Sequence, residues 1–242
     1  MPIPGLYKIF DHWHQTGACH IISDTHFGED DLKAGISNRP TDDELVKMIN
    51  TKCGRADTLI HLGDVGDLTY VQKLRAKYKI LICGNHDKGS TIYLRDHGTC
   101  CLDKNSYATM RDAFAEATKR YPNYLLNFSE TEDSWVVFYD NNLFDEVYTG
   151  ALIIGEKIIL SHEPIDCLPS WLYNLHGHDH AGGRTDKRHR NVCADVIGYQ
   201  PINFNQWMKE GHLARVEEAH RDTIDKATRR KIKRGGKKMG EK

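Results

Sequence analysis

Five short polar clusters, each placed directly after an apolar run, constrain the fold of this chain more than any other feature. They are Asp24-Thr25-His26, Gly63-Asp64, Gly84-Asn85-His86-Asp87, Ser161-His162 and Gly177-His178-Asp179-His180. The apolar runs are typical of buried strands, and in an open α/β sheet the carboxyl ends of the strands form the edge where ligands bind. The pattern therefore predicts that the clusters lie together at one sheet edge.

The first half of the chain alternates expected strands with expected helices. Strands are predicted over 18–23, 58–62 and 80–83. Helices are predicted after the Thr41-Asp42-Asp43-Glu44 capping box and over 68–78. Short links between alternating strands and helices favour parallel pairing with right-handed crossovers.

The second half is richer in short strands. A helix is predicted over 107–121, and a hairpin break is predicted at Gly155-Glu156. Strands are predicted over 135–139, 146–148, 151–154, 157–161, 172–176 and 191–196. This distribution favours an α/β fold with two sheets packed together and helices outside.

The residue types in the five clusters are those that bind divalent metal ions. Asp24 and His26 are two apart, so on an extended segment they project to the same side and can share one ion. His178 and His180 have the same spacing, and either share one ion or are divided between two. Three further candidates complete the set. Asp64 has two carboxylate oxygens and can bridge two ions, Asn85 offers an amide oxygen, and His162 offers another imidazole nitrogen. Oxygen and imidazole ligands without thiolate favour Mn, Fe, Zn or Ni.

In this order, the clusters resemble the motif series D-x-H, G-D, G-N-H-D/E, H and G-H-x-H of the calcineurin-like metallophosphoesterase superfamily. The resemblance implies a four-layer α/β/β/α sandwich with a dinuclear metal site at the carboxyl edge of the strands. It implies that one ion is held by Asp24, His26, Asp64 and His180, and the other by Asp64, Asn85, His162 and His178. It also implies that His86 is the catalytic histidine and that Asp87 orients it.

The expected reaction is hydrolysis of a phosphomonoester or phosphodiester by metal-hydroxide attack, because two ions lower the pKa of bound water and neutralise phosphate charge. A nuclease acting on DNA or RNA is an alternative, favoured by the basic loop 184–190 and a basic tail. A non-catalytic scaffold on the same fold is a third alternative, although no ligand position is missing. A protein phosphatase is less favoured, because Gly63–Leu68 lacks that branch's arginine and Asp87 replaces its glutamate.

Further stretches, Asn38-Arg39-Pro40, Ser161–Pro164 and 195–203, resemble a small group of bacterial and phage phosphoesterases. Arg39 is expected to bind the substrate phosphate, with a surface ion pair as the alternative. The group has a shorter segment after its third motif. Residues 90–134 are therefore expected to be an insertion, and an insertion near the site can cap it.

The chain is expected to hold one metallophosphoesterase domain over 1–220 and a basic tail over 221–242. The tail has ten Lys or Arg against three Asp or Glu, which leaves the domain at -8 within an overall charge of -1. An acidic body disfavours a nuclease groove, although the tail is compatible with nucleic acid. The sequence shows no membrane span or secretory signal, and its seven cysteines form no C-x-x-C pair. A reduced, cytoplasmic protein is therefore expected.

Overall fold

The computed structural model of the chain describes residues 17–30, 35–36, 38–87, 91–154, 157–183, 186–214, 216 and 228–229. The Gly155-Glu156 break and nearly all of the basic tail lie outside these residues. No helix in the described part of the chain is both long enough and apolar enough to cross a membrane.

The first sheet has five strands and carries the first three polar clusters. Its order is β12 (Ile202–Asn203), β1 (Cys19–Ile22), β2 (Thr58–His61), β3 (Tyr78–Ile82) and β7 (Glu146–Tyr148). The strands β1, β2, β3 and β7 are parallel, and β12 is antiparallel to β1. The predicted parallel pairing of the first three strands is therefore confirmed.

The second sheet has four strands and carries the last two clusters. Its order is β11 (His189–Asn191), β10 (Tyr173–His176), β9 (Ile158–Leu160) and β8 (Leu152–Ile154). The strands β9, β10 and β11 are parallel, whereas β8 runs antiparallel beside β9.

The two sheets pack face to face because side chains alternate along each strand. Ile21 and Ile60 belong to the cluster that also holds Leu160 and Leu175 of the second sheet. Ile22 faces the other way and packs with residues of helix α3 (Asp42–Lys52). Fully burying each such side chain contributes about 1.5–3 kcal/mol.

Helix α3 begins where the sequence predicts. Thr41 is its N-cap and accepts from the Glu44 backbone, while the Glu44 carboxylate accepts from the Thr41 backbone N–H at 2.9 Å. The second helix, α4, spans only Leu68–Val71, so the predicted 68–78 helix is too long. The chain instead turns at residues 72 and 73 and reaches β3 at Tyr78 without continuing as a helix. The short helices η1 (Thr91–Tyr93) and α6 (Phe204–Lys209) complete the body.

The outer face of the second sheet differs from the expected sandwich. Among the described residues, Leu168 and Leu172 from a loop pack on Ile159 there, and α6 instead places Phe204 and Trp207 in the cluster between the sheets. The fourth, helical layer therefore stays a prediction.

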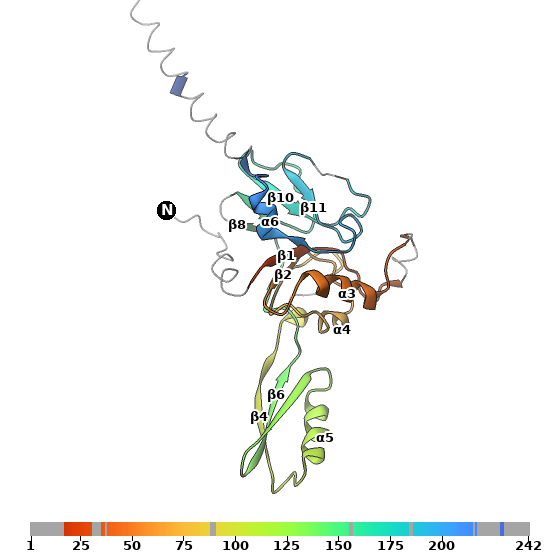
Figure 1. Ribbon diagram of the computed structural model, residues 1–242, viewed down its shortest axis with the longest axis vertical. Coiled ribbons are helices and arrows are strands. Elements are labelled where there is room, and N and C mark those ends of the chain that lie inside the picture. Colours follow the sequence, from red (N-terminus) through yellow and green to blue (C-terminus); the bar gives the residue numbers. More distant parts are fainter. Residues whose placement is uncertain are drawn as a thin grey trace, which may run out of the picture.

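Residues 97–140 form a separate unit, the arm, which extends away from the two sheets (Figure 1). Its antiparallel strands β4 (His97–Asp103), β6 (Ser134–Asp140) and β5 (Leu125–Glu130) lie against helix α5 (Met110–Arg120). Leu102, Ala113, Ala117, Trp135 and Val137 form its own core. The arm includes β6, so it continues beyond the expected insertion limit of residue 134.

The base of the arm lies beside the beginning of β3. Arg95 is paired with both Asp140 and Asp145, and Asp145 accepts from the Lys79 backbone N–H at 2.8 Å. Asn142 donates to the carbonyl of Gln72 at 2.6 Å. The polar clusters follow the opposite ends of the strands, so these contacts do not support the expectation that the insertion caps the site.

Candidate metal centre

The five polar clusters begin where five parallel strands end. The first three follow β1, β2 and β3, and the last two follow β9 and β10. The segment after β1 is tied to the segment after β2 by backbone hydrogen bonds from Asp24 to Gly63 and from His26 to Asp64. Gly177 accepts no larger residue, since a Cβ there would lie 2.2 Å from Asp24 Oδ2. The two sheets therefore bring their clusters together at one edge.

Four of the expected ligands have left-handed backbone conformations. Their φ angles are 58° at Asp24, 41° at His26, 56° at Asp64 and 70° at His178. Such conformations are uncommon outside glycine and concentrate at functional sites, where the surrounding structure holds them. Here they turn the side chains out of the strand direction and toward one another.

The first ligand group consists of Asp24, His26 and His180. Asp24 Oδ1 lies 4.0 Å from His26 Nε2 and 3.9 Å from His180 Nε2. Asp24 is fully buried, and its Oδ1 and the Nε2 of His26 have no hydrogen-bond partner. Buried polar atoms are normally satisfied, so two converging unpaired ligand atoms fit a metal ion.

The second ligand group consists of Asp64, His162 and His178. His162 Nε2 lies 3.3 Å from Asp64 Oδ2, 3.2 Å from His178 Nδ1 and 2.9 Å from Asn85 Oδ1. Four potential ligand atoms therefore surround one position. The structure places the Asn85 side-chain oxygen beside this group.

Asp64 connects the two groups. Its Oδ2 lies 3.6 Å from His26 Nε2 in the first group and 3.3 Å from His162 Nε2 in the second. Its Oδ1 is held by the backbone N–H of His86 at 2.9 Å. One carboxylate oxygen is thus within reach of both groups.

Three histidines are oriented through the ring nitrogen that does not face the centre. His26 Nδ1 donates to Glu29, His180 Nδ1 donates to Asp195 at 2.5 Å, and His162 Nδ1 donates to the Leu62 carbonyl. A neutral ring that donates through Nδ1 keeps its Nε2 lone pair for a metal ion, and such support is usual for a metal-binding imidazole. Sequence reasoning missed Glu29 and Asp195 in this role.

A family model described as calcineurin-like phosphoesterase matches residues 20–237. The chain belongs to the calcineurin-like phosphoesterase family. No curated protein matches the chain. Among solved structures, a protein of unknown function from Aquifex aeolicus is similar, at 21% identity and a TM-score of 0.48, over 79% of this chain and 98% of the other.

Phosphoesterases of this family typically bind two divalent ions, and the donor set here fits such ions. Three further groups could be tested for metal: His20 with Cys53 and Asp57, His26 with Glu29 and His86, and His180 with Cys193 and Asp195. The last two share residues with the centre. The first lies at the opposite ends of β1 and β2, where Asp57 already accepts from the backbone of Ala18 and Gly54.

Arg39 contacts residues of the centre, but its side chain is buried and bonded to the protein rather than open to a substrate. Its side chain is 2% exposed and forms a two-pronged ion pair with Asp195, at 3.1 and 2.9 Å. Its other terminal nitrogen donates to the carbonyls of Asp24 and Thr25. These contacts do not support the expectation that Arg39 binds a substrate phosphate, nor the alternative of a surface ion pair. Arg39 instead positions Asp195 and the segment after β1.

Asp87 also differs from its expected role. Its carboxylate accepts from the backbone N–H groups of Asp64, Val65 and Gly84, at 2.9, 3.0 and 2.8 Å. It therefore ties the segment after β2 to the segment after β3, rather than orienting the His86 ring. The His86 side chain is exposed, and its ring centroid is 5.3 Å from that of His26.

The electrostatics of the centre follow from burial and close pairing. Burial raises the pKa of Asp64, but hydrogen bonds from His162 and the His86 backbone outweigh it and lower that pKa to about 2. The hydrogen bond to Asp195 raises the pKa of His180. Burial lowers the pKa of His61 to about 4, so this ring is neutral while it bonds Thr25 and the Gly63 backbone.

A pocket of about 370 Å³ adjoins the second ligand group. Asn85 and His162 line it, together with Ala151, Ile165 and the exposed Glu163. Among the described residues that line it there is no lysine or arginine.

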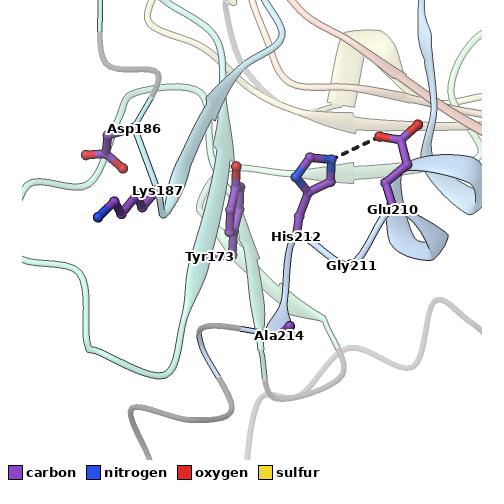
Figure 2. Close-up of a pocket in the computed structure, with 7 residues that line it drawn as sticks. All are labelled: Tyr173, Asp186, Lys187, Glu210, Gly211, His212 and Ala214. Carbon is purple, nitrogen blue, oxygen red and sulfur yellow. Dashed lines mark hydrogen bonds and ion pairs between the residues drawn. The ribbon is translucent and has the colours of Figure 1, made fainter.

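A different pocket, also of about 370 Å³, lies between β10 and the segment that follows α6 (Figure 2). His212 stands between Tyr173 and Glu210 and is hydrogen-bonded to that glutamate at 3.0 Å. None of the predicted metal ligands lines this pocket.

Proposed function

We propose that this chain is a dinuclear-metal phosphoesterase that hydrolyses a small phosphomonoester or phosphodiester. The observation that carries the proposal is the position of Asp64 Oδ2, which lies within 3.6 Å of an Nε2 atom from each ligand group. One ion would be held by Asp24, His26, Asp64 and His180, and the second by Asp64, Asn85, His162 and His178. The four-layer sandwich belongs to the same proposal.

Two divalent ions supply Lewis acidity, which lowers the pKa of water and neutralises charge on phosphate oxygens. Residues of the chain orient the imidazole rings that would bind these ions. Glu29 and Asp195 keep the Nδ1 atoms of His26 and His180 protonated, so that each Nε2 lone pair faces inward. Manganese is the metal that we expect first, with iron, zinc and nickel as the alternatives.

His86 is the residue that we propose for proton transfer. Its side chain is exposed beside the first ligand group, and its backbone is fixed to Asp64 Oδ1. An imidazole in this place can donate a proton to the leaving oxygen of the ester, and such catalysis typically contributes about 10²–10⁴ in rate.

The pocket beside Asn85 and His162 supports a small, uncharged ester group. None of the described residues that line it is cationic, and the exposed Glu163 would repel further phosphates of a polymer. Within the basic loop, Arg188 is held by the protein itself, because it donates to the carbonyls of Leu168 and Pro169. We therefore rank a nuclease second.

The test compares hydrolysis of a nitrophenyl monoester, a nitrophenyl diester, cyclic nucleotides and single-stranded DNA, with Mn, Ni, Zn and Mg in turn. We expect the fastest rates on a small ester and two bound ions per chain. His86→Ala should keep both ions while kcat falls by about 10²–10³. Asp64→Asn should lose both activity and the second ion.

His97→Ala is the matched control, because His97 is an exposed histidine on the arm. It should keep both the wild-type rate and the metal content. Full activity in Asp64→Asn or His86→Ala would contradict the assignment. Substoichiometric metal without hydrolysis would favour the scaffold alternative, and a clear preference for DNA would favour the nuclease.

A further inference from the structure

A third pocket, of about 460 Å³, gathers positive charge away from the metal centre. Five cationic residues are among its lining residues: Arg55, Lys73, Arg75, Lys77 and Arg95. Among the described residues that line it there is no aspartate or glutamate. This concentration stands out, since residues 1–220 carry a net charge of -8.

The segment 72–77 forms one wall of the pocket; it begins with a turn at residues 72 and 73 and alternates in burial from residue 73 to residue 77. Leu74 and Ala76 are 2% and 4% exposed, whereas Lys73, Arg75 and Lys77 are exposed. The three cations therefore lie on the solvent side of the segment, with the buried Leu74 and Ala76 between them.

Neighbouring side chains hold this segment in place. The Asn142 amide donates to the carbonyls of Gln72 and Leu74, at 2.6 and 3.4 Å. The buried Lys79 donates to Asn142 at 2.7 Å and to the Ala76 carbonyl at 3.4 Å. The Arg75 backbone N–H donates to Asn50. The wall is thus built into the fold rather than being a free loop.

Two of the five cations have carboxylate partners, and three do not. Lys73 is 2.9 Å from Asp43, and Arg95 is paired with Asp140 and Asp145. In the part of the chain that the structure describes, Arg55, Arg75 and Lys77 form no ion pair. Three unpaired cations around one cavity repel one another, and an anion bound among them relieves that repulsion.

The pocket is distinct from the metal centre. Segment 72–77 precedes β3, whereas Asn85 follows its other end. Five residues of strand separate the two regions by about 16 Å, at 3.3 Å per residue. A single phosphate cannot contact both places.

We propose that this pocket binds a run of consecutive phosphate groups in a small molecule, such as inorganic tripolyphosphate or the triphosphate of a nucleotide. A guanidinium matches phosphate oxygens, and several cations around one pocket match a ligand that carries several phosphate charges. None of the described residues that line the pocket is aromatic, so these residues lack the stacking surface typical of single-stranded nucleic acid sites.

The test measures binding of inorganic tripolyphosphate to the full-length protein by calorimetry, in EDTA so that the metal centre does not compete. We expect one saturable site whose affinity falls with added salt. The triple variant Arg55→Gln, Arg75→Gln, Lys77→Gln should bind at least about tenfold more weakly. Orthophosphate should bind more weakly than tripolyphosphate to the wild-type protein.

The matched control is Lys47→Gln, Arg111→Gln, Lys119→Gln, which removes the same charge from exposed positions outside the pocket. It should change the affinity by less than about twofold. An equal loss in both variants, or no saturable binding to the wild-type protein, would overturn the proposal. Tighter, pocket-dependent binding of a single-stranded oligonucleotide than of tripolyphosphate would overturn it in favour of a nucleic-acid site.

Discussion

At the scale of single residues, the centre depends on atoms that face away from it. Each of three histidines has one ring nitrogen fixed by Glu29, Asp195 or a backbone carbonyl, which leaves the other nitrogen for a ligand role. Asp195 is the most heavily used of these partners, since it also binds Arg39 through both oxygens. The ligand set is therefore only part of what the centre requires.

Asp195→Asn should weaken metal binding without unfolding the protein. An amide lacks the charge that raises the pKa of His180 and that pairs with Arg39, so the imidazole is less firmly oriented. We expect metal affinity to fall by about 10–100-fold, as measured by competition with a chelator. Excess metal should restore most of the hydrolysis.

The control is Asp186→Asn, which removes the carboxylate partner of His189 in a region remote from the centre. Its metal affinity should match that of the wild-type protein. Equal metal affinity in Asp195→Asn and the wild type would show that Asp195 does not support the centre.

At the scale of elements, hydrogen bonds join the loops that follow neighbouring strands. The Asp87 carboxylate accepts three backbone N–H groups, two from the segment after β2 and one from its own segment after β3. Gly84 lies in the same close contact, since a Cβ there would be 2.2 Å from Asp64 Oδ1. The position of Asp64 thus depends on two loops at once.

Asp87→Ala should destabilise the whole domain, because it leaves three partly buried N–H groups without their charged acceptor. We expect the free energy of unfolding to fall by about 2–4 kcal/mol in urea denaturation. Asp103→Ala is the matched control. That exposed carboxylate also accepts a backbone N–H, from Asn105, but only within a turn, and its loss should cost less than about 1 kcal/mol. Equal losses in the two variants would contradict the locking role.

The buried Lys79 in β3 should make the free energy of unfolding rise with pH in the alkaline range. Burial lowers its folded-state pKa to about 8, whereas the unfolded chain keeps the ordinary value of 10.5. Between these values the unfolded state binds more protons, so stability rises with pH. From pH 7 to 9.5 the gain is about 2 kcal/mol.

This gain is measured as the difference in free energy of unfolding between wild type and Lys79→Met at each pH. The subtraction removes the titration of cysteines and tyrosines that both proteins share. We expect wild type to gain relative to Lys79→Met above about pH 8. A difference that stays constant from pH 7 to 9.5 would show that Lys79 is not the group responsible.

At the scale of the whole molecule, the sequence predicts the strands that carry the polar clusters better than the contacts around those clusters. The apolar runs locate β1, β2, β3, β9 and β10 because a buried parallel strand requires such a run. The capping box locates the start of α3 for an equally local reason. Features with local causes were therefore predictable.

The features that sequence reasoning missed depend on contacts between distant segments. Arg39 and Asp195 are 156 residues apart, and their pairing is decided by how the two sheets meet. The left-handed conformations of Asp24 and Asp64 are likewise imposed by tertiary contacts, since neither residue type requires them. The α4 helix ends early in a turn at residues 72 and 73, and the alternating burial of Leu74 and Ala76 that follows does not fit one face of a helix.

The arm offers the final prediction, because its attachment separates it from the metal centre. His97 and Asp140 are directly opposed in the β4–β6 register, so a two-residue Asn-Gly turn can join them after removal of residues 98–139. Arg95 keeps both of its carboxylate partners in this shortened chain. All predicted metal ligands remain, and the arm core that is lost contains only residues of the arm itself. We therefore expect the shortened protein to bind the same number of metal ions.

Its rate on a nitrophenyl ester should stay within about threefold of wild type, because remote sites act independently. Ala113→Asp, which disrupts the arm core within the full chain, should give the same result by a different route. Metal content and rate are measured for both. Loss of metal or a large fall in kcat in both variants would mean that the arm supports the centre through contacts beyond its base. A fall confined to larger esters would instead assign the arm to substrate selection.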